Sequence, residues 1–275
     1  MEWQHPEINR VIRSALEEDI GAGDITTEAC VQAEARGGGI FLARQALVLA
    51  GVELLPQIYD ALGGVERLDL LRSSGNQVHE GETVARVEGK LRTLLTTERT
   101  ALNFLQRLSG VATLARRFVQ AAEGARCRVL DTRKTTPGMR RLEKLAVAAG
   151  GADNHRFGLF DAVLIKNNHI TAAGGIRPAI ERARAAGKPI EIEVRTQTDL
   201  DEALACGADH LLLDNFTVAE VAEAVRRIAG RARVEVSGGV TLETVRAYAE
   251  AGADFISAGA LTHSAPAVDL SFRIV

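Results

Sequence analysis

The sequence of 275 residues contains few cysteines and histidines, and neither kind is spaced as metal ligands usually are. Its three cysteines, Cys30, Cys127 and Cys206, lie far apart and form no CxxC pair, so neither a disulfide framework nor a structural zinc site is indicated. The six histidines form no HExxH or other close ligand pair. We therefore expect no metal ion bound through histidine.

Long apolar runs and an excess of positive charge are also absent. No apolar stretch approaches the roughly 18 residues of a membrane-spanning helix, and residues 1–10 lack the pattern of a signal peptide. The net charge of -3 argues against nucleic acids and membrane surfaces as partners, because proteins that bind them usually carry a basic excess. We expect a cytoplasmic protein that binds neither.

The positive charge that the chain does carry is concentrated. Only five residues are lysine, and two of them, Lys134 and Lys166, lie with Arg133 and Arg156 in the segments 131–138, 154–156 and 165–169. Short apolar runs that are typical of buried strands accompany these cations. Arginine offers a planar fork for carboxylate or phosphate, and lysine offers a point charge. The cluster predicts a site for a ligand with several anionic groups, and a solvated basic surface is the alternative.

From residue 129 onward, short apolar runs alternate with helix-like segments, a pattern typical of parallel strands joined by crossover helices. The six runs are residues 129–131, 163–166, 190–194, 211–214, 234–237 and 255–259. In a β/α barrel, functional residues gather at the carboxyl ends of the strands. Those ends hold Lys166, Glu193, Asp214, Ser237 and Gly259. We predict an incomplete parallel β/α barrel of six or seven strands, and an open doubly wound sheet is the alternative.

The first hundred residues indicate a smaller α+β domain, with a helix near residues 7–18 and a hairpin over 76–89. A helix over residues 97–122 carries an apolar stripe. We expect Gly110 to kink or split it, since glycine inside a helix costs about 1 kcal/mol against alanine. The predicted domains are therefore residues 1–109 and the barrel of residues 110–265, with the tail 266–275 as a candidate to pack on the first.

Two acids end consecutive predicted strands, so the carboxylates of Glu193 and Asp214 can face one cavity. Magnesium takes one or two protein carboxylates together with substrate phosphates and water. Three interpretations are open: the pair binds Mg²⁺, it stabilises a cationic transition state, or it forms ion pairs with the nearby cations.

Two glycine-containing turns follow the last predicted strands, Ser237-Gly238-Gly239 and Gly259-Ala260. Backbone N–H groups in such turns can approach a phosphate closely, although glycine there can equally serve only to turn the chain. His263 follows the second turn, either as a donor to the ligand or as an exposed loop residue. His155 and His169 have cationic or amide neighbours, which favours hydrogen-bonding roles, and His155 is the stronger candidate.

With these residues laid out, the chain closely resembles the quinolinate phosphoribosyltransferases, the carboxylating nicotinate-nucleotide pyrophosphorylases of NAD biosynthesis. The resemblance runs nearly end to end. Its most specific part is Asp131-Thr132-Arg133-Lys134-Thr135-Thr136-Pro137-Gly138 with Asn154-His155-Arg156 downstream. The other matching segments are residues 18–27, 98–103, 150–151, 211–215 and 237–239.

The resemblance implies that a phosphoribosyl group passes from phosphoribosyl pyrophosphate to the ring nitrogen of quinolinate, followed by loss of carbon dioxide to give nicotinate mononucleotide. It implies that the two quinolinate carboxylates are held by Arg99, Arg133, His155 and Arg156. Lys134 and Lys166 would serve the anionic centre and pyrophosphate, while Glu193 and Asp214 would hold Mg²⁺ or ribose hydroxyls. The 5-phosphate would be received by Ser237, Gly238, Gly239, Gly259 and His263.

The resemblance also implies a homodimer, alone or within a higher oligomer, in which Arg99 enters the site of the neighbouring subunit. Arg195 adds a positive charge just past Glu193, a departure that the site can tolerate. Three other functions remain open: a related pyrophosphorylase-like protein with a different acceptor, a Schiff-base aldolase that uses Lys166, and a non-catalytic binder of an anionic metabolite.

Overall fold

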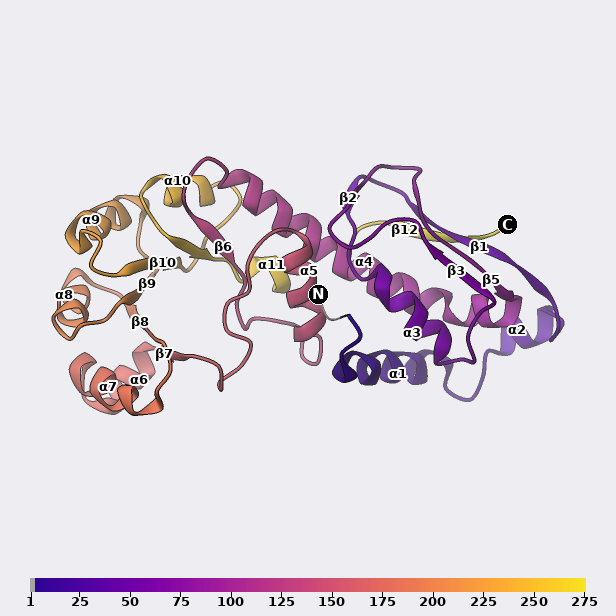
Figure 1. The fold of residues 1–275 in the computed structure, drawn as a ribbon, viewed down its shortest axis with the longest axis horizontal. Helices are drawn as coiled ribbons and strands as arrows, with labels where there is room; N and C mark the ends of the chain where they lie inside the picture. Colours follow the sequence, from indigo (N-terminus) through magenta and orange to yellow (C-terminus); the bar gives the residue numbers. More distant parts are fainter. Residues whose placement is uncertain (1–2) are drawn as a thin grey trace. The chain divides into compact units, whose positions relative to one another are not determined.

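The computed structural model describes residues 3–275, which fold into two compact units (Figure 1). The first unit takes in the chain up to Arg116 together with Thr135–Gly151 and Leu261–Val275, and the second takes in Arg117–Lys134 and Ala152–Ala260. The chain passes between the units several times, so they do not follow the single boundary expected after residue 109.

The first unit is built on an antiparallel sheet. Among the described residues its strand order is β12–β1–β5–β3, from Leu270–Ile274, Arg36–Ala43, Thr83–Lys90 and Arg67–Leu70. The helices of this part of the chain are α1 (Pro6–Ile20), α2 (Ile25–Cys30), the 3-10 helix η1 (Val52–Leu54), α3 (Leu55–Asp60), α4 (Leu91–Ala121), α5 (Arg140–Ala149) and α11 (Ala260–His263). The tail that was expected to pack on this domain supplies β12, whose partner is β1.

The predicted helix near residues 7–18 is α1. Pro6 stands at its start, where a missing N–H costs nothing, and Ile8, Ile12 and Leu16 place apolar side chains on one buried face. The hairpin predicted over residues 76–89 is wrong. β4 (Gln77–Val78) pairs with β2 (Leu47–Val48) in a separate sheet, whereas β5 pairs with β1 and β3.

The prediction that Gly110 kinks or splits the long helix is also wrong, because α4 is continuous from Leu91 to Ala121. Gly110 is required there for a tertiary reason. A Cβ atom at this position would collide with the carbonyl oxygen of Pro266 and would lie 3.2 Å from the Cα atom of Ala267. The missing side chain lets the C-terminal segment lie directly against the helix.

A buried ion pair joins several segments of the first unit. The Glu143 side chain is fully buried and accepts hydrogen bonds from Arg107 Nη2 at 2.7 Å, Thr136 N at 3.0 Å and Thr136 Oγ1 at 2.8 Å. Arg107 also donates to the carbonyl oxygens of Thr262 and Ala265. The pair therefore fixes the loop that contains Thr136 and the start of the C-terminal segment to helices α4 and α5.

The second unit contains a parallel sheet. Within residues 3–275 this sheet has six strands in the order β6–β11–β10–β9–β8–β7, and β6 and β7 are its two edges. The strands are β6 (Arg128–Leu130), β7 (Val163–Ile165), β8 (Ile190–Val194), β9 (His210–Asp214), β10 (Arg233–Ser237) and β11 (Phe255–Ser257). The connecting helices are α6 (Asn167–Ala173), α7 (Ile176–Ala183), η2 (Arg184–Ala186), α8 (Gln197–Ala205), α9 (Val218–Ile228) and α10 (Val245–Glu250). The predicted incomplete barrel is confirmed, with six strands.

Helix caps in this unit follow the sequence signals closely. Thr217 is the N-cap of α9 and forms a capping box with Glu220. Pro178 is the third residue of α7, within its first turn. Within the described chain, no helix is both long and apolar enough to span a membrane.

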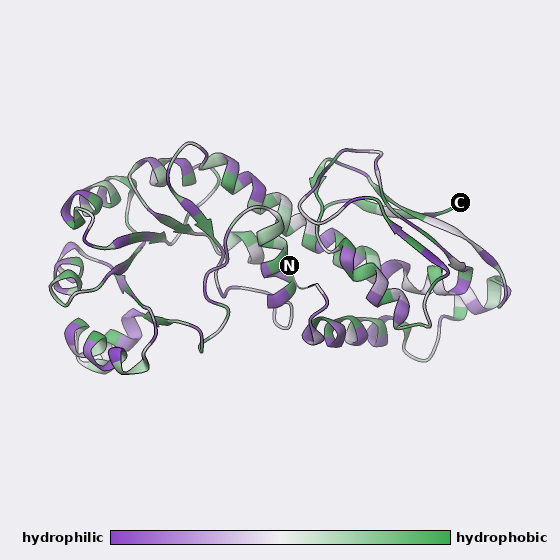
Figure 2. Ribbon diagram, in the orientation of Figure 1, coloured by the Kyte–Doolittle hydropathy of each residue, from purple (hydrophilic) through white to green (hydrophobic). Residues whose placement is uncertain are grey.

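Along each strand, successive side chains point to opposite faces of the sheet, one covered by the helices and the other facing the inside of the barrel. Apolar residues such as Ile192, Leu211 and Val236 are fully buried on one face. The interleaved positions are often charged, and Figure 2 shows hydrophilic stretches interrupting the hydrophobic ones along these strands. The inner face of the sheet is therefore polar.

We expect Gly110→Ala to lower the free energy of unfolding by about 1–3 kcal/mol, the usual cost of overpacking. The new methyl group meets backbone rather than a movable side chain, which outweighs the roughly 1 kcal/mol that alanine gains in helix propensity. Urea unfolding measures the change. The matched control is Asn103→Ala at an exposed position of the same helix, expected within about 0.5 kcal/mol of the unchanged protein. Equal stabilities of the two variants would contradict the packing argument.

Candidate active site

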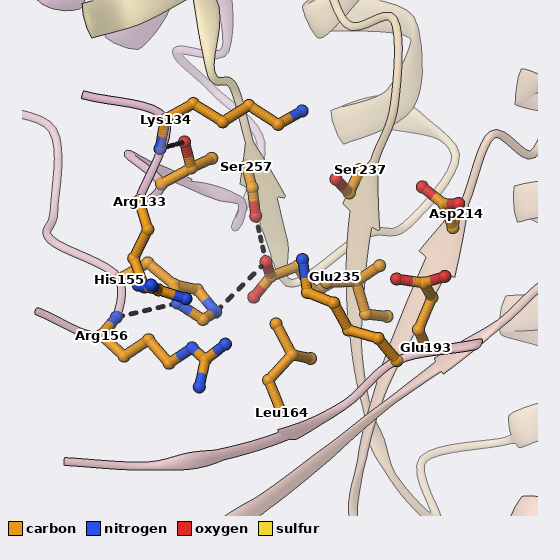
Figure 3. Close-up of a pocket in the computed structure, with 13 residues that line it drawn as sticks. Arg133, Lys134, His155, Arg156, Leu164, Glu193, Asp214, Glu235, Ser237 and Ser257 are labelled. Carbon is orange, nitrogen blue, oxygen red and sulfur yellow. Dashed lines mark hydrogen bonds and ion pairs between the residues drawn. The ribbon is translucent and has the colours of Figure 1, made fainter. Parts of the chain in front are cut away.

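A pocket opens at the carboxyl ends of the strands of the second unit (Figure 3). It is lined by Thr132, Arg133, Lys134, His155, Arg156, Leu164, Lys166, Glu193, Leu212, Asp214, Glu235, Ser237 and Ser257. The residues among these that the sequence predicted are Arg133, Lys134, His155, Arg156, Lys166, Glu193, Asp214 and Ser237. The structure thus brings both strand-end acids and the cationic cluster together in one cavity.

The remaining predicted residues do not line this pocket within the described chain. Arg99 is exposed on α4 in the first unit. Gly238 and Gly239 directly follow the pocket residue Ser237, and Gly259 directly precedes α11. His263 is an exposed residue of α11, and its Nδ1 atom lies 2.6 Å from Ser264 Oγ. Their assignment to the 5-phosphate and to a neighbouring site stays a prediction.

Charge is divided between two sides of the pocket. Figure 3 shows Arg133, His155 and Arg156 on one side, and Glu193 and Asp214 on the other. Burial and the neighbouring charge of Arg133 lower the pKa of Arg156, against the opposite influence of Glu191 and Asp161. Two guanidinium groups that repel each other in a partly buried site favour an anion between them.

A buried carboxylate holds the cationic side in place. Asp131 follows β6, is fully buried, and accepts hydrogen bonds from the backbone N–H of His155 at 2.8 Å and from Asn154 Nδ2 at 2.9 Å. Asp153 adds a parallel bridge to Leu130 beside it. The segment from residue 153 to 156 is therefore fixed to the end of β6, which explains how residues distant in the sequence from Arg133 come to share its pocket.

The acidic side contains an ion pair, one of the three interpretations that the sequence left open for these acids. Nη2 of Arg195 lies 3.2 Å from Glu193 Oε1 and 3.3 Å from Asp214 Oδ2, so one guanidinium bridges both acids. The Arg195 side chain is 51% exposed and can move away at little cost. Two carboxylates that face one cavity supply the oxygen ligands that Mg²⁺ prefers. The acidic pair thus fits both an ion pair and a magnesium site.

The turn after β10 requires glycine. Gly238 has a φ of 95°, in the left-handed region that favours glycine. A side chain there would collide with Asn215 Oδ1 and lie 2.9 Å from Asn215 N, the atom that donates to Ser237 O at 2.8 Å. Glycine at position 238 thus leaves room for Asn215, whose hydrogen bond to Ser237 links the ends of β9 and β10. This packing requirement explains the glycine even if no ligand binds there.

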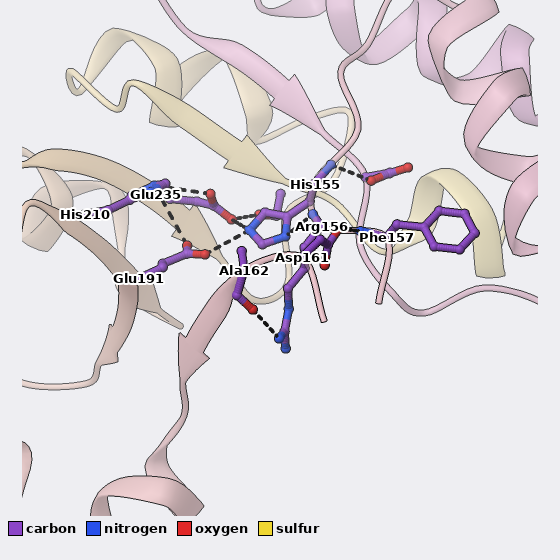
Figure 4. Close-up of polar contacts among 10 residues, drawn as sticks. His155, Arg156, Phe157, Asp161, Ala162, Glu191, His210 and Glu235 are labelled. Carbon is purple, nitrogen blue, oxygen red and sulfur yellow. Dashed lines mark hydrogen bonds and ion pairs between the residues drawn. The ribbon is translucent and has the colours of Figure 1, made fainter. Parts of the chain in front are cut away.

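Three side chains that contact His155 or its partners, Glu191, His210 and Glu235, were not found from the sequence. His155 Nε2 lies 2.9 Å from Glu191 Oε2 and 3.5 Å from Glu235 Oε1. His210 Nε2 lies 3.5 Å from Glu235 Oε2 and 3.9 Å from Glu191 Oε1 (Figure 4). Glu191 precedes Glu193 by two residues and Glu235 precedes Ser237 by two, so the period of a strand places each on the inner face. This two-residue period was the sequence signal that could have identified Glu191 and Glu235.

The fold and the pocket define an α/β-barrel protein that binds an anionic ligand at the carboxyl ends of its strands. Comparison with known proteins gives the family. Residues 24–109 match the family model for the N-terminal domain of quinolinate phosphoribosyl transferase, and residues 111–273 match the model for its C-terminal domain. The chain belongs to the quinolinate phosphoribosyl transferase family.

Similar proteins cover almost the whole chain. The probable carboxylating nicotinate-nucleotide pyrophosphorylase of Bacillus subtilis is 38% identical over 98% of this chain and 94% of its own length. The chloroplastic carboxylating enzyme of Arabidopsis thaliana is 40% identical over 98% of this chain and 84% of its own. The solved nicotinate-nucleotide pyrophosphorylase of Francisella tularensis has a TM-score of 0.94 at 37% identity, covering 99% of this chain and 98% of that one.

Proposed function

We propose that the protein transfers a phosphoribosyl group from phosphoribosyl pyrophosphate to quinolinate, with loss of carbon dioxide, to give nicotinate mononucleotide for NAD biosynthesis. The carboxylating relatives at about the same identity along the full chain support this activity. The structural observation that carries it is the division of charge in the pocket, with Arg133 and Arg156 facing a carboxylate pair. An acceptor with two carboxylates and a donor that develops positive charge need these two sides.

The cationic side would bind quinolinate. Arg133 and Arg156 each offer a planar fork to a carboxylate, and their mutual repulsion is relieved when an anion lies between them. Lys134 and Lys166 line the same pocket and would neutralise the pyrophosphate that leaves. The ring nitrogen then attacks C1 of the ribose while the bond from C1 to the pyrophosphate oxygen breaks, and the electron pair leaves with pyrophosphate.

The acidic side would stabilise the ribose as it reacts. Positive charge develops on the sugar while the C1–oxygen bond breaks, and Glu193 and Asp214 place negative charge where it develops. The same two carboxylates would hold Mg²⁺, which when bound neutralises charge on the phosphates. After transfer, the carboxylate next to the ring nitrogen leaves as carbon dioxide and the ring carbon takes a proton. The turn from Ser237 to Gly239, with Gly259 and His263, would receive the 5-phosphate.

Product formation tests the proposal directly. The purified protein is incubated with phosphoribosyl pyrophosphate, Mg²⁺ and either quinolinate or nicotinate, and nicotinate mononucleotide is measured by chromatography. We expect product from quinolinate only. Nicotinate has one carboxylate where quinolinate has two, so it would leave one set of hydrogen-bond donors in the pocket without a partner. Binding of phosphoribosyl pyrophosphate without turnover of quinolinate would instead support a different acceptor or a non-catalytic binder.

The Arg195 bridge generates a prediction about magnesium. We expect Arg195→Ala to lower the Mg²⁺ concentration for half-maximal activity by about two- to fivefold, since an exposed ion pair is worth about 0.2–1 kcal/mol and here competes with the cation. Arg246→Ala is the control, because Arg246 pairs with Glu250 on the exposed surface of α10. A higher magnesium requirement in Arg195→Ala would show that Arg195 assists the substrate instead.

We also propose a homodimer in which Arg99 acts in the partner's site. Its exposed position on α4, outside the pocket lining of its own chain, supports this. Arg99→Ala and Lys134→Ala should each be nearly inactive, whereas mixed dimers of the two variants should regain activity because one of their sites has both residues intact. Sedimentation of the active enzyme as a monomer would rule the proposal out.

A further inference from the structure

Two buried glutamates and two partly buried histidines form a ring beside the cationic side of the pocket (Figure 4). Glu191, His210 and Glu235 come from the adjacent strands β8, β9 and β10, and His155 comes from the segment held by Asp131. Imidazole and carboxylate alternate around the ring, with nitrogen-to-oxygen separations from 2.9 to 3.9 Å. Among these contacts, the one between His155 Nε2 and Glu191 Oε2 is the shortest.

The position of the His155 proton follows from the contacts of its ring. Nδ1 accepts a hydrogen bond from the backbone N–H of Arg156 at 2.8 Å, so Nδ1 carries a lone pair. The ring proton is then on Nε2, where it is donated to Glu191. Both nitrogens are engaged within the protein, so the ring of His155 is held in one orientation at the edge of the pocket.

We propose that Glu191 is a positioning residue: by accepting a hydrogen bond from Nε2 of His155 it fixes the tautomer and the orientation of this imidazole, and through the ring it positions the adjacent Arg156 toward the substrate carboxylate. The inference rests on the proposed function for the identity of that carboxylate. His155 links the two groups, since its ring contacts Glu191 on one side and the backbone of Arg156 on the other. A carboxylate that orients a histidine in this way is a common device in binding sites.

The two glutamates of the ring are not equivalent. Glu235 is fully buried, receives a hydrogen bond from Ser257 and faces His155, His210 and Glu191. Burial raises the pKa of Glu235, and the charge of Glu191 raises it further, while His210, His155 and Ser257 act in the opposite direction. Two carboxylates this close and this dry do not both ionise readily. Burial therefore favours the neutral form of Glu235, and the two glutamates differ in their surroundings.

A metal ion is the competing occupant, because donor atoms of His155, Glu191 and Glu235 all lie within 4.8 Å of one another. Coordination through His155 Nε2 requires the lone pair on that nitrogen. The proton would then move to Nδ1 and the hydrogen bond from Arg156 would be lost. The observed contact at Nδ1 therefore favours the proton-sharing ring.

Isosteric variants separate the two glutamates. We expect Glu191→Gln to raise the KM for quinolinate at least about tenfold, with the KM for phosphoribosyl pyrophosphate little changed. Glu235→Gln should raise the quinolinate KM much less than Glu191→Gln does, because Glu235 lies 3.5 Å from His155 Nε2 whereas Glu191 lies 2.9 Å from it. Glu250→Gln, at an exposed ion pair on α10, is the matched control for an unchanged enzyme. Equal losses in both ring variants, together with one bound metal ion per unmodified chain by elemental analysis, would overturn the proposal.

A measurement that needs neither turnover nor a variant completes the test. Nitrogen-15 NMR of the histidine side chains in the unmodified protein at neutral pH reports the tautomer of each ring. The proposal requires a neutral His155 with its proton on Nε2, and a doubly protonated ring would overturn it even if the variants failed to fold. An inactive unmodified enzyme that shows this tautomer would reject the proposed function and leave the ring geometry standing.

Discussion

The site depends on carboxylates buried in the interior of an open barrel. A charge removed from water is strongly unfavourable unless hydrogen-bond donors surround it, so each such acid fixes the groups that satisfy it. Asp131 holds the backbone of His155, and Glu191 holds its side chain. One residue is thereby fixed at two points by two strands, and the cationic side of the pocket takes its geometry from this double attachment.

The same principle operates in the first unit through Glu143. This acid is fully buried between Arg107 and Thr136, and removing one partner of such a pair typically costs about 3–5 kcal/mol. The motif from residue 131 to 138 therefore has two kinds of member. Arg133 and Lys134 line the pocket, whereas Asp131 and Thr136 make hydrogen bonds that hold the loop. The motif is therefore specific as a sequence signature because some of its residues hold the loop and others line the pocket.

The barrel was predictable because apolar runs of strand length recur between helix signals. Because functional residues of a β/α barrel gather at the carboxyl ends of its strands, those ends identified Lys166, Glu193, Asp214 and Ser237. The deeper ring was missed because Glu191 and Glu235 lie within strands, although a period of two relates them to the strand-end positions. Their partner His155 is far away in sequence, and no local pattern predicts that contact. The prediction of a kink at Gly110 was wrong for the same reason. Helix propensity is a local property, whereas the carbonyl of Pro266, which requires glycine at this position, comes from the far end of the chain.

The two sides of the pocket differ in how well their charges are already balanced. Arg195 bridges Glu193 and Asp214 and compensates both acids within the protein, so a cation that binds there must first displace a guanidinium. On the other side, Arg133 and Arg156 repel each other, and the repulsion is strengthened by burial because a lower dielectric screens charge less. An anion that enters this side adds attraction and also removes repulsion. An anion that binds here therefore meets two cations that repel each other, whereas a cation on the other side meets two acids that Arg195 already bridges.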